Sequence, residues 1–463
     1  MVFASLSFLF FFLPLVLVAY FAFRNRTWRN AVLFAASVFF YAWGEPRYVV
    51  LMLASVAVNW AVARAMARWP ARAKVLLACG VTLDLLGIGV FKYAAFLTAS
   101  ANGVLQTHLP VPQVALPIGI SFYTFQAISY LVDVYRGTVK PQRNPVFFGT
   151  YLTMFSQLIA GPIVRYETIE GELMHRQENL TDFAAGIRRF CIGFGKKVLI
   201  ANAMGKVTDS VLGSTPAVGA IPAWFGLVAY AFQIYFDFSG YSDMAIGLGR
   251  MLGFHFLENF NYPYIARSVT EFWRRWHISL SSFFRDYVYF PLGGSRVRPP
   301  RLVLNLVIVW SLTGLWHGAH WNFVCWGAYY GLLIIGEKLL WGGLLTRLPA
   351  AVQHVYLLAI VLLGWVMFRI EDFAQMLEWL GALFGAHGLG HPATLTALGV
   401  LQYYPWFVVA AIGSTPLPRR VLERLESGRY LGWVMDGAFG CLLIWSVVSL
   451  AVGGFNPFIY YRF

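Results

Sequence analysis

The chain has 463 residues, of which 59% are hydrophobic and only 12% are charged, and its formal net charge is +14. Soluble domains carry about 25% charged residues, so this composition excludes an ordinary soluble protein and predicts a polytopic membrane protein. The excess of Lys and Arg fits cytoplasmic loops under the positive-inside rule. A nucleic-acid partner is not expected, because no segment combines a soluble basic face with exposed aromatic residues.

Apolar runs of roughly 20 residues are the sequence signal of membrane-spanning helices. The candidate segments are approximately 4–23, 31–43, 48–66, 75–98, 115–133, 146–163, 186–205, 216–236, 302–318, 321–341, 354–369, 396–412 and 432–453. Several of these are too short or too polar to cross a bilayer alone. We therefore expect an all-α fold with about ten to twelve transmembrane helices, plus re-entrant and interfacial helices.

The early loops alternate in charge, which predicts the orientation of the chain. Arg24, Arg26 and Arg29 follow the first apolar segment and place that loop in the cytoplasm and the N-terminus outside. We interpret residues 1–463 as a single membrane-embedded domain. Its core, about 110–330, holds most of the intramembrane polar residues, and the segments 1–100 and 340–463 are predicted to frame it.

Polar residues first interrupt the apolar pattern in the first half of the chain. The segments LPIGISFYTFQAISYLVDVYRG (Leu116–Gly137) and SQLIAGPIVRYE (Ser156–Glu167) mix polar and apolar residues. Within a membrane, such segments are expected to line a polar cavity or to form irregular backbone that is buried in protein. Lys92, alone in an apolar run, is expected to extend its ammonium group to the membrane surface.

Two carboxylates lie in the apolar segment YFDFSGYSDMAIGLG (Tyr235–Gly249). Asp237 and Asp243 are candidates for a substrate or donor site, or for a proton relay, because ionisable groups inside a membrane are costly. The simpler interpretation, which we favour, is that Asp237 and Ser239 cap a broken helix. The neighbouring glycines would then allow close packing.

The segment TEFWRRWHISLSSFFRDYVYFPLGG (Thr270–Gly294) is too charged to span a membrane. Its apolar residues recur at helical spacing, which predicts one amphipathic helix at the interface or along a cavity, capped by Thr270 and ended by PLGG. Arg274, Arg275 and Arg285 lie mostly on the polar side. His277 lies among them, and a lone histidine in such a place is more often structural.

The segment LTGLWHGAHWNF (Leu312–Phe323) places His317 and His320 in apolar surroundings. The pair is three residues apart on an expected helix, but no metal is predicted, because histidines without a carboxylate ligand are a weak metal signal. A neutral imidazole at His317 is better suited to act as a general base. Trp321 and Asn322 indicate that His320 lies near the membrane surface.

Glycines flank this segment at spacings that bring helices together. Gly314 and Gly318, and then Gly327 and Gly331, form two small-xxx-small patterns. Such patterns let helix backbones approach closely, and here they would also leave room beside His317.

Taken in order, these motifs resemble the membrane-bound O-acyltransferases, most closely the bacterial alginate O-acetyltransferase branch. The resemblance is carried by FWRRWHISLSSFFRDYVYFPLGG, LTGLWHGAHWNFVCWGAYYG, DFSGYSDMAIGLG, LPIGISFYTFQAISYLVDVYRG and LIAGPIVRYE, and it extends to about residue 370. It implies a many-helix bundle around a central tunnel, with His317 at the invariant histidine of the family and His277 at its second polar position.

The resemblance also implies a function. No cofactor would be bound; acetyl-CoA in the cytoplasm would donate acetyl groups, which cross the inner membrane. A periplasmic acetyltransferase partner would then place them on an exopolysaccharide such as alginate. D-alanyl transfer to teichoic acid and acetylation of peptidoglycan remain open. A proton-coupled transporter and a non-catalytic scaffold for a periplasmic partner are the alternatives from other functional classes.

In this interpretation His317 is the base, and Trp316 or Asn322 could donate a hydrogen bond to the developing oxyanion. Coenzyme A carries phosphates that arginine binds well. The candidate phosphate ligands are Arg274, Arg275, Arg285, Arg296, Arg298 and Arg301. The positive-inside rule explains the last three equally well.

Overall fold

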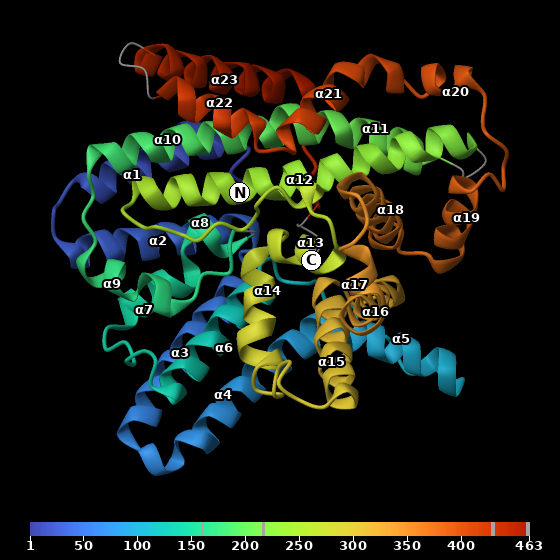
Figure 1. The fold of residues 1–463 in the computed structure, drawn as a ribbon. Coiled ribbons are helices and arrows are strands. Elements are labelled where there is room, and N and C mark those ends of the chain that lie inside the picture. Colours follow the sequence, from blue (N-terminus) through green and yellow to red (C-terminus); the bar gives the residue numbers. More distant parts are fainter. Residues whose placement is uncertain (160, 215–217, 427–430, 460–463) are drawn as a thin grey trace. The chain divides into compact units, whose positions relative to one another are not determined.

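A computed structural model describes residues 1–159, 161–214, 218–426 and 431–459. Over these residues the secondary structure is helical throughout and contains no strand, which confirms the predicted all-α class (Figure 1). The chain forms two compact units, the first from Met1–Phe190 and Met244–Leu257 and the second from Cys191–Asp243 and Glu258–Ile459. That both belong to one membrane-embedded domain stays a prediction.

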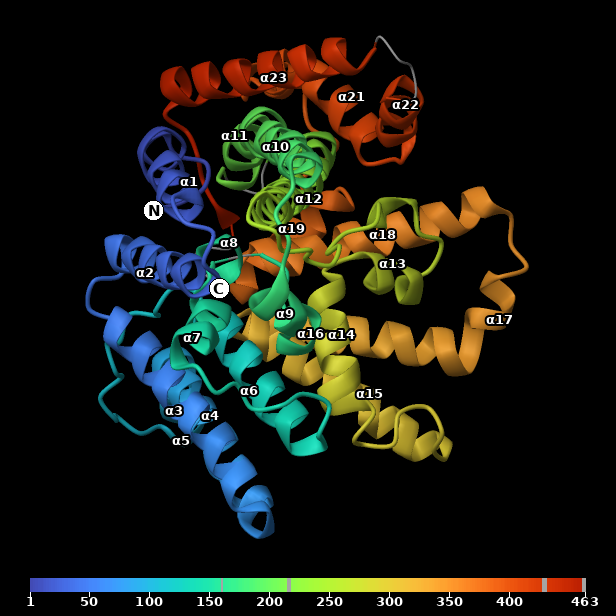
Figure 2. The same ribbon diagram turned by 90° about the vertical axis from the view of Figure 1, so that its left-hand side faces the viewer.

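The first unit contains the N-terminal helices. They are η1 (Phe8–Phe12), α1 (Leu13–Phe21), α2 (Arg26–Gly44), α3 (Val49–Arg68), η2 (Pro70–Arg72), α4 (Ala73–Ile88), η3 (Gly89–Tyr93), α5 (Ala94–Leu105), α6 (Ile120–Arg136), α7 (Pro145–Thr153), α8 (Phe155–Leu158) and α9 (Tyr166–His175). Helix α2 begins where the Asn25 side chain accepts hydrogen bonds from the N–H groups of Thr27 and Trp28, which is the usual role of Asn at an N-cap. Helices α3, α4 and α6 lie side by side (Figures 1 and 2).

Helices α10 (Leu180–Gly195) and α12 (Ala220–Met251) each contribute to both units. The second unit also contains η4 (Lys196–Ala201), α11 (Asn202–Leu212), η6 (Pro263–Ile265), α13 (Val269–Arg275), α14 (Ile278–Phe284), η7 (Arg285–Tyr289), α15 (Pro299–His317), α16 (Trp321–Gly336), η8 (Glu337–Trp341), α17 (Gly342–Leu345), α18 (Ala350–Arg369), α19 (Phe373–Leu383), α20 (Pro392–Ala397), η9 (Val400–Tyr403), α21 (Tyr404–Gly413), α22 (Leu417–Glu426) and α23 (Leu431–Gly453).

Some of these helices are long and apolar enough to cross a bilayer. Among the described residues there are 5: Val49–Arg68, Pro70–Leu105, Trp321–Leu345, Ala350–Arg369 and Gly432–Gly453. Phe8–Phe21 and Val400–Gly413 are apolar but shorter. The membrane character is thus supported, whereas the predicted ten to twelve spans are not confirmed.

Helix α12 corrects the prediction of a helix broken near Asp237. It runs for 32 residues without interruption, so neither Asp237 nor Ser239 is a cap. The predicted close packing is present: a Cβ atom on Gly240 would lie 2.7 Å from the carbonyl oxygen of Gly193 in α10. The helix therefore continues through its carboxylates, and other elements must balance their charge.

The segment after α12 also differs from its prediction. One amphipathic helix was expected from Thr270, but α13 ends at Arg275 and α14 begins at Ile278, with His277 in the left-handed region at φ 45°. The predicted cap, Thr270, lies inside α13, and the cap is instead Ser268, whose hydroxyl oxygen accepts from the N–H of Glu271 at 3.0 Å. The Glu337 carboxylate accepts hydrogen bonds from the first two N–H groups of α13, those of Val269 and Thr270. Sequence patterns miss such a cap because it comes from 67 residues away.

Two predictions for the first unit had different outcomes. Lys92 is buried and donates a hydrogen bond to the Ser121 hydroxyl at 3.2 Å, so the expectation that it reaches the membrane surface was wrong. The backbone of 161–164 is non-helical and buried, as expected for irregular backbone covered by protein. In Leu116–Gly137 the backbone is instead mostly a regular helix, α6, whose polar side chains are mostly buried, and that they line a polar cavity stays a prediction.

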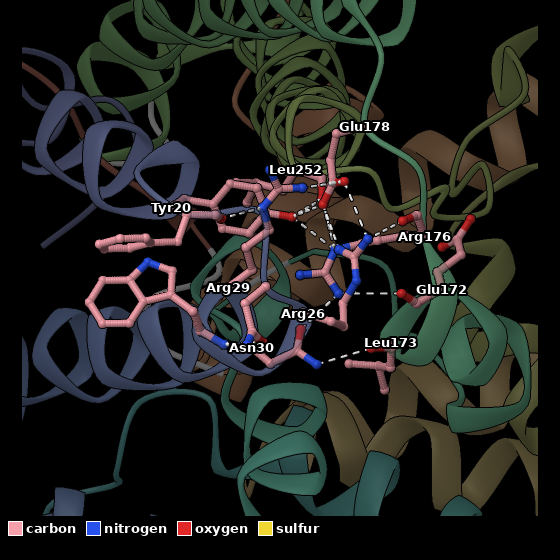
Figure 3. A network of polar contacts seen from close by, with 12 residues as sticks. Tyr20, Arg26, Arg29, Asn30, Glu172, Leu173, Arg176, Glu178 and Leu252 are labelled. Atoms are coloured by element: carbon pink, nitrogen blue, oxygen red, sulfur yellow. Dashed lines mark hydrogen bonds and ion pairs between the residues drawn. The ribbon is translucent and has the colours of Figure 1, made fainter.

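An ion-pair network joins distant segments of the first unit (Figure 3). Glu178 lies 2.6 Å from a guanidinium nitrogen of Arg26 and 2.5 Å from one of Arg29, and it accepts from the Tyr20 hydroxyl at 2.6 Å. Arg176, whose side chain is fully buried, donates to Asn30 at 2.7 Å. Because every charged member has an opposite charge or a hydrogen-bond partner, the network can hold these loops together in a partly buried place.

Candidate functional site

His317 lies at the last position of α15 and is 2% exposed. Aromatic rings surround its imidazole: the ring centroids lie 5.0 Å from Trp316, 4.9 Å from Trp326 and 5.3 Å from Phe368. His320, by contrast, is exposed and precedes α16. The two histidines therefore do not share a helical face. His317 is enclosed by apolar rings that keep bulk water away from it.

Close contact between α15 and α16 fixes where His317 stands (Figure 1). A Cβ atom on Gly314 would lie 2.4 Å from the Phe323 carbonyl oxygen, and one on Gly327 would lie 2.5 Å from the Trp310 carbonyl oxygen. This confirms the close approach that the small-xxx-small patterns predict. The expected empty space beside His317 is not there, because the Phe323 ring fills the position next to Gly318.

His277 is the second buried imidazole, at 1% exposure, and it lies in the break between α13 and α14. It is outside the five candidate spans, and burial lowers its pKa to about 3, so the ring is neutral at physiological pH. Its left-handed backbone is unusual for a residue with a side chain. Such strain is most often found where function requires it.

Trp316 brings the two predicted histidines to one place. Its ring lies 5.8 Å from the imidazole of His277 and 5.0 Å from that of His317, measured between centroids. Asn322, which follows His317 in the same sequence motif, is fully buried. Its amide nitrogen donates to the Met367 carbonyl oxygen at 3.0 Å. That bond orients the amide towards α18, while its oxygen has no hydrogen-bond partner among the described residues.

The arginine candidates are either paired with nearby acids or exposed. Arg275 pairs with Glu271 one helical turn earlier at 2.8 Å, and Arg285 pairs with Asp286 at 2.7 Å. Arg274 is exposed and forms no ion pair with a described residue. Arg296, Arg298 and Arg301 are exposed as well, in and after the loop before α15. Their roles in binding phosphate stay predictions.

Both aspartates in α12 are paired with lysines from η4. Asp237 lies 2.8 Å from the Lys197 ammonium, and both side chains are buried. Asp243 lies 2.7 Å from Lys196. The C-terminal segment completes the first pair, because Asp237 accepts from the N–H of Ile459 at 2.9 Å and Lys197 donates to the Pro457 carbonyl oxygen. These partners balance both carboxylates, so no bound ligand is needed to explain their burial. The predicted substrate- or donor-binding roles of Asp237 and Asp243 stay untested.

Asn259 was missed by sequence reasoning. It is fully buried, and its amide oxygen lies 3.2 Å from Nδ1 of His277. Its position between α12 and η6 carries no motif, and no spacing rule connects residue 259 to residue 277. The only signal is an Asn in a short segment between long helices, which would ordinarily be interpreted as a turn residue.

Comparison with known proteins places this site in a family. Residues 140–369, which include both histidines, match the family described as MBOAT, membrane-bound O-acyltransferase. The probable alginate O-acetylase AlgI of Azotobacter vinelandii is 42% identical, and the alignment covers 100% of both chains. The chain belongs to the membrane-bound O-acyltransferase family. The predicted resemblance is therefore confirmed, and so is the prediction that the protein is an acyl-transferring enzyme.

Two further relatives show how this acyltransferase compares within the family. The probable alginate O-acetylase AlgI of Pseudomonas putida is 39% identical over 100% of both chains. The peptidoglycan O-acetyltransferase of Helicobacter pylori is 32% identical over 82% of this chain and 79% of its own. Similarity thus extends along the whole acyltransferase chain, including the segment after residue 370 where sequence motifs alone become weak.

Proposed function

We propose that this acyltransferase is an O-acetyltransferase of the bacterial inner membrane, with its N-terminus on the periplasmic side. It takes acetyl groups from cytoplasmic acetyl-CoA and passes them across the membrane for O-acetylation of an exopolysaccharide such as alginate. The full-length similarity to proteins named alginate O-acetylase supports this acceptor class. The peptidoglycan O-acetyltransferase is less similar, so peptidoglycan is the second candidate acceptor.

The observation that carries the residue assignment is the burial of two imidazoles against one indole. His317 takes the proton of the hydroxyl that first receives the acetyl group and hands it on to the partner enzyme, and the resulting oxygen attacks the thioester carbonyl carbon. The carbon–sulfur bond then breaks, and the thiolate takes up the proton from His317. A positioned base of this kind contributes typically 10²–10⁴-fold to the rate. His277 supports it, and the Trp316 indole is in contact with both rings.

Arginine supplies the donor site in this proposal. Arg274 and the exposed Arg296, Arg298 and Arg301 bind the phosphates of coenzyme A, since Arg275 and Arg285 are already paired with acids. The acetyl group then passes to a periplasmic acetyltransferase partner, which completes the transfer to the polymer. Membrane lipid surrounds the apolar helices.

The test replaces each histidine of the LTGLWHGAHWNF segment in turn. His317→Ala and, as a matched control, the exposed His320→Ala are inserted in proteoliposomes with labelled acetyl-CoA, the partner enzyme and either alginate or peptidoglycan. We expect His317→Ala to lose about 10²–10⁴-fold of the transfer to alginate and His320→Ala to retain it. Undiminished transfer by His317→Ala would refute the assignment of the base, and preferential labelling of peptidoglycan would replace the acceptor.

A further inference from the structure

Asn259, from a separate segment, lies against the N-terminal end of α14, next to His277. Its backbone carbonyl accepts from the N–H of Ile278 at 2.9 Å, and its amide oxygen accepts from the N–H of Ser279 at 3.1 Å. These are the first two N–H groups of α14, which the left-handed His277 leaves without a local cap. One residue from a separate segment thus caps the helix that begins at His277.

The Ser279 N–H fixes which way the Asn259 amide points. A backbone N–H can only donate, so the amide atom that faces it must be the oxygen. The amide nitrogen accordingly points to the hydroxyl oxygen of Ser242, to which it donates at 3.2 Å. The opposite orientation would set two donors against each other. It follows that the atom 3.2 Å from Nδ1 of His277 is an acceptor.

We propose that Asn259 is a positioning residue that holds His277 as its Nδ1–H tautomer and leaves Nε2 as the proton-accepting nitrogen. Because an amide oxygen accepts but cannot donate, Nδ1 must carry the hydrogen of the neutral ring. The Ser279 hydroxyl does not take over this role, since it lies 2.9 Å from the Asn259 oxygen but 3.4 Å from Nδ1. Nε2 has no hydrogen-bond partner among the described residues.

Backbone contacts hold the ring in the same position. The N–H of Asn261 donates to the Arg275 carbonyl at 2.9 Å, so the segment 259–261 is bonded on both sides of His277. The Phe238 ring packs edge-on, with its centroid 4.7 Å from that of the imidazole, and the Trp316 ring makes a second edge contact at 5.8 Å. The ring is therefore fixed in orientation and in tautomer, and its buried Nε2 is left as an acceptor that no described residue occupies. This inference rests on the proposed function of His277 in acetyl transfer.

The tautomer can be measured without any activity. Nitrogen-15 spectra of histidine-labelled protein in bilayers distinguish protonated from unprotonated ring nitrogens, and His277→Gln identifies the resonances of His277. We expect a protonated Nδ1 and an unprotonated Nε2 in the wild type. Asn259→Ala should give a mixture of both tautomers, and Asn259→Asp, which keeps the acceptor, should retain Nδ1–H. A wild-type ring protonated at Nε2, or a single Nδ1–H form in Asn259→Ala, would overturn the inference.

Measurements of acetyl-transfer activity provide a second test of the role of Asn259. Asn259→Ala should lower kcat by between about 10- and 100-fold, as loss of an orienting partner does for metal-bound imidazoles, with KM for the donor little changed. Asn259→Asp should restore most of kcat. The matched control is Asn305→Ala, which removes another fully buried amide that donates to Leu292 and Gly294 and does not touch His277. An equal loss of kcat in Asn305→Ala would reduce Asn259 to a structural residue.

The two proposals fail in different ways. If His277→Gln transfers acetyl groups at the wild-type rate, the proposed role of His277 is wrong, whatever its tautomer. If His277→Gln is inactive while Asn259→Ala keeps both the Nδ1–H form and full activity, the role of His277 stands and that of Asn259 is wrong.

Discussion

Replacing Gly314 by Ala tests whether close contact of α15 and α16 positions the base. The new Cβ would lie 2.4 Å from the Phe323 carbonyl oxygen, whereas ordinary van der Waals contact begins at 3.4 Å, so the helices must separate by 3.4 − 2.4 = 1.0 Å. The atom that blocks it belongs to the backbone and cannot rotate away. Overpacking of this kind costs about 1–3 kcal/mol of stability.

The shift would also reach His317, three residues further along α15. A misplacement of about 1 Å can lower a rate about 10²-fold. We therefore expect Gly314→Ala to be inserted in the membrane, to melt earlier in detergent and to transfer acetyl groups about 10²-fold more slowly. Gly343→Ala is the control, because its Cβ would meet nothing within 4 Å. Wild-type kcat in Gly314→Ala would show that the close approach is not needed for catalysis.

Two further predictions concern buried charges. Burial alone would raise the pKa of Glu178, but hydrogen bonds from Arg26 and Tyr20 outweigh it and lower the pKa from 4.5 to about 2. The pairing therefore stabilises the fold above about pH 4.5, by about 3 kcal/mol, and this stabilisation is lost as the pH falls towards 2. Detergent melts should show Glu178→Gln less stable than wild type at pH 7, with the gap narrowing by pH 3 and closing as the pH approaches 2; a constant gap would contradict this. Breaking the buried Lys197–Asp237 pair with Lys197→Met or Asp237→Asn should cost about 3–5 kcal/mol each, because either change leaves a partner without its charge. The double variant should cost clearly less than the sum in denaturant unfolding, and simple additivity would show that the two side chains are not coupled.

Sequence patterns predicted what depends on local periodicity. The all-helical class, the close α15–α16 contact through Gly314 and Gly327, and the separation of buried His317 from exposed His320 follow from residues near one another in the chain. These features are recoverable because helical spacing and small residues act over a few turns.

Features that depend on distant partners could not be predicted in this way. Asp237 was expected to interrupt a helix, yet α12 continues because Lys197 on another element balances the carboxylate. The break at His277 has no local signal either, since its left-handed backbone is held by Asn259. The buried position of Lys92 depends on Ser121 in the same way.

The contact of segment 457–459 with α12 has a consequence for biosynthesis. Ile459 supplies a donor to Asp237 and Pro457 an acceptor to Lys197, although Ile459 is synthesised 222 residues after Asp237. Until translation has passed residue 459, this charge pair lacks part of its hydrogen-bonding shell, and proteins fold progressively from their N-terminal side. A product that stops before Pro457 would leave the pair incomplete and would be open to quality-control proteolysis.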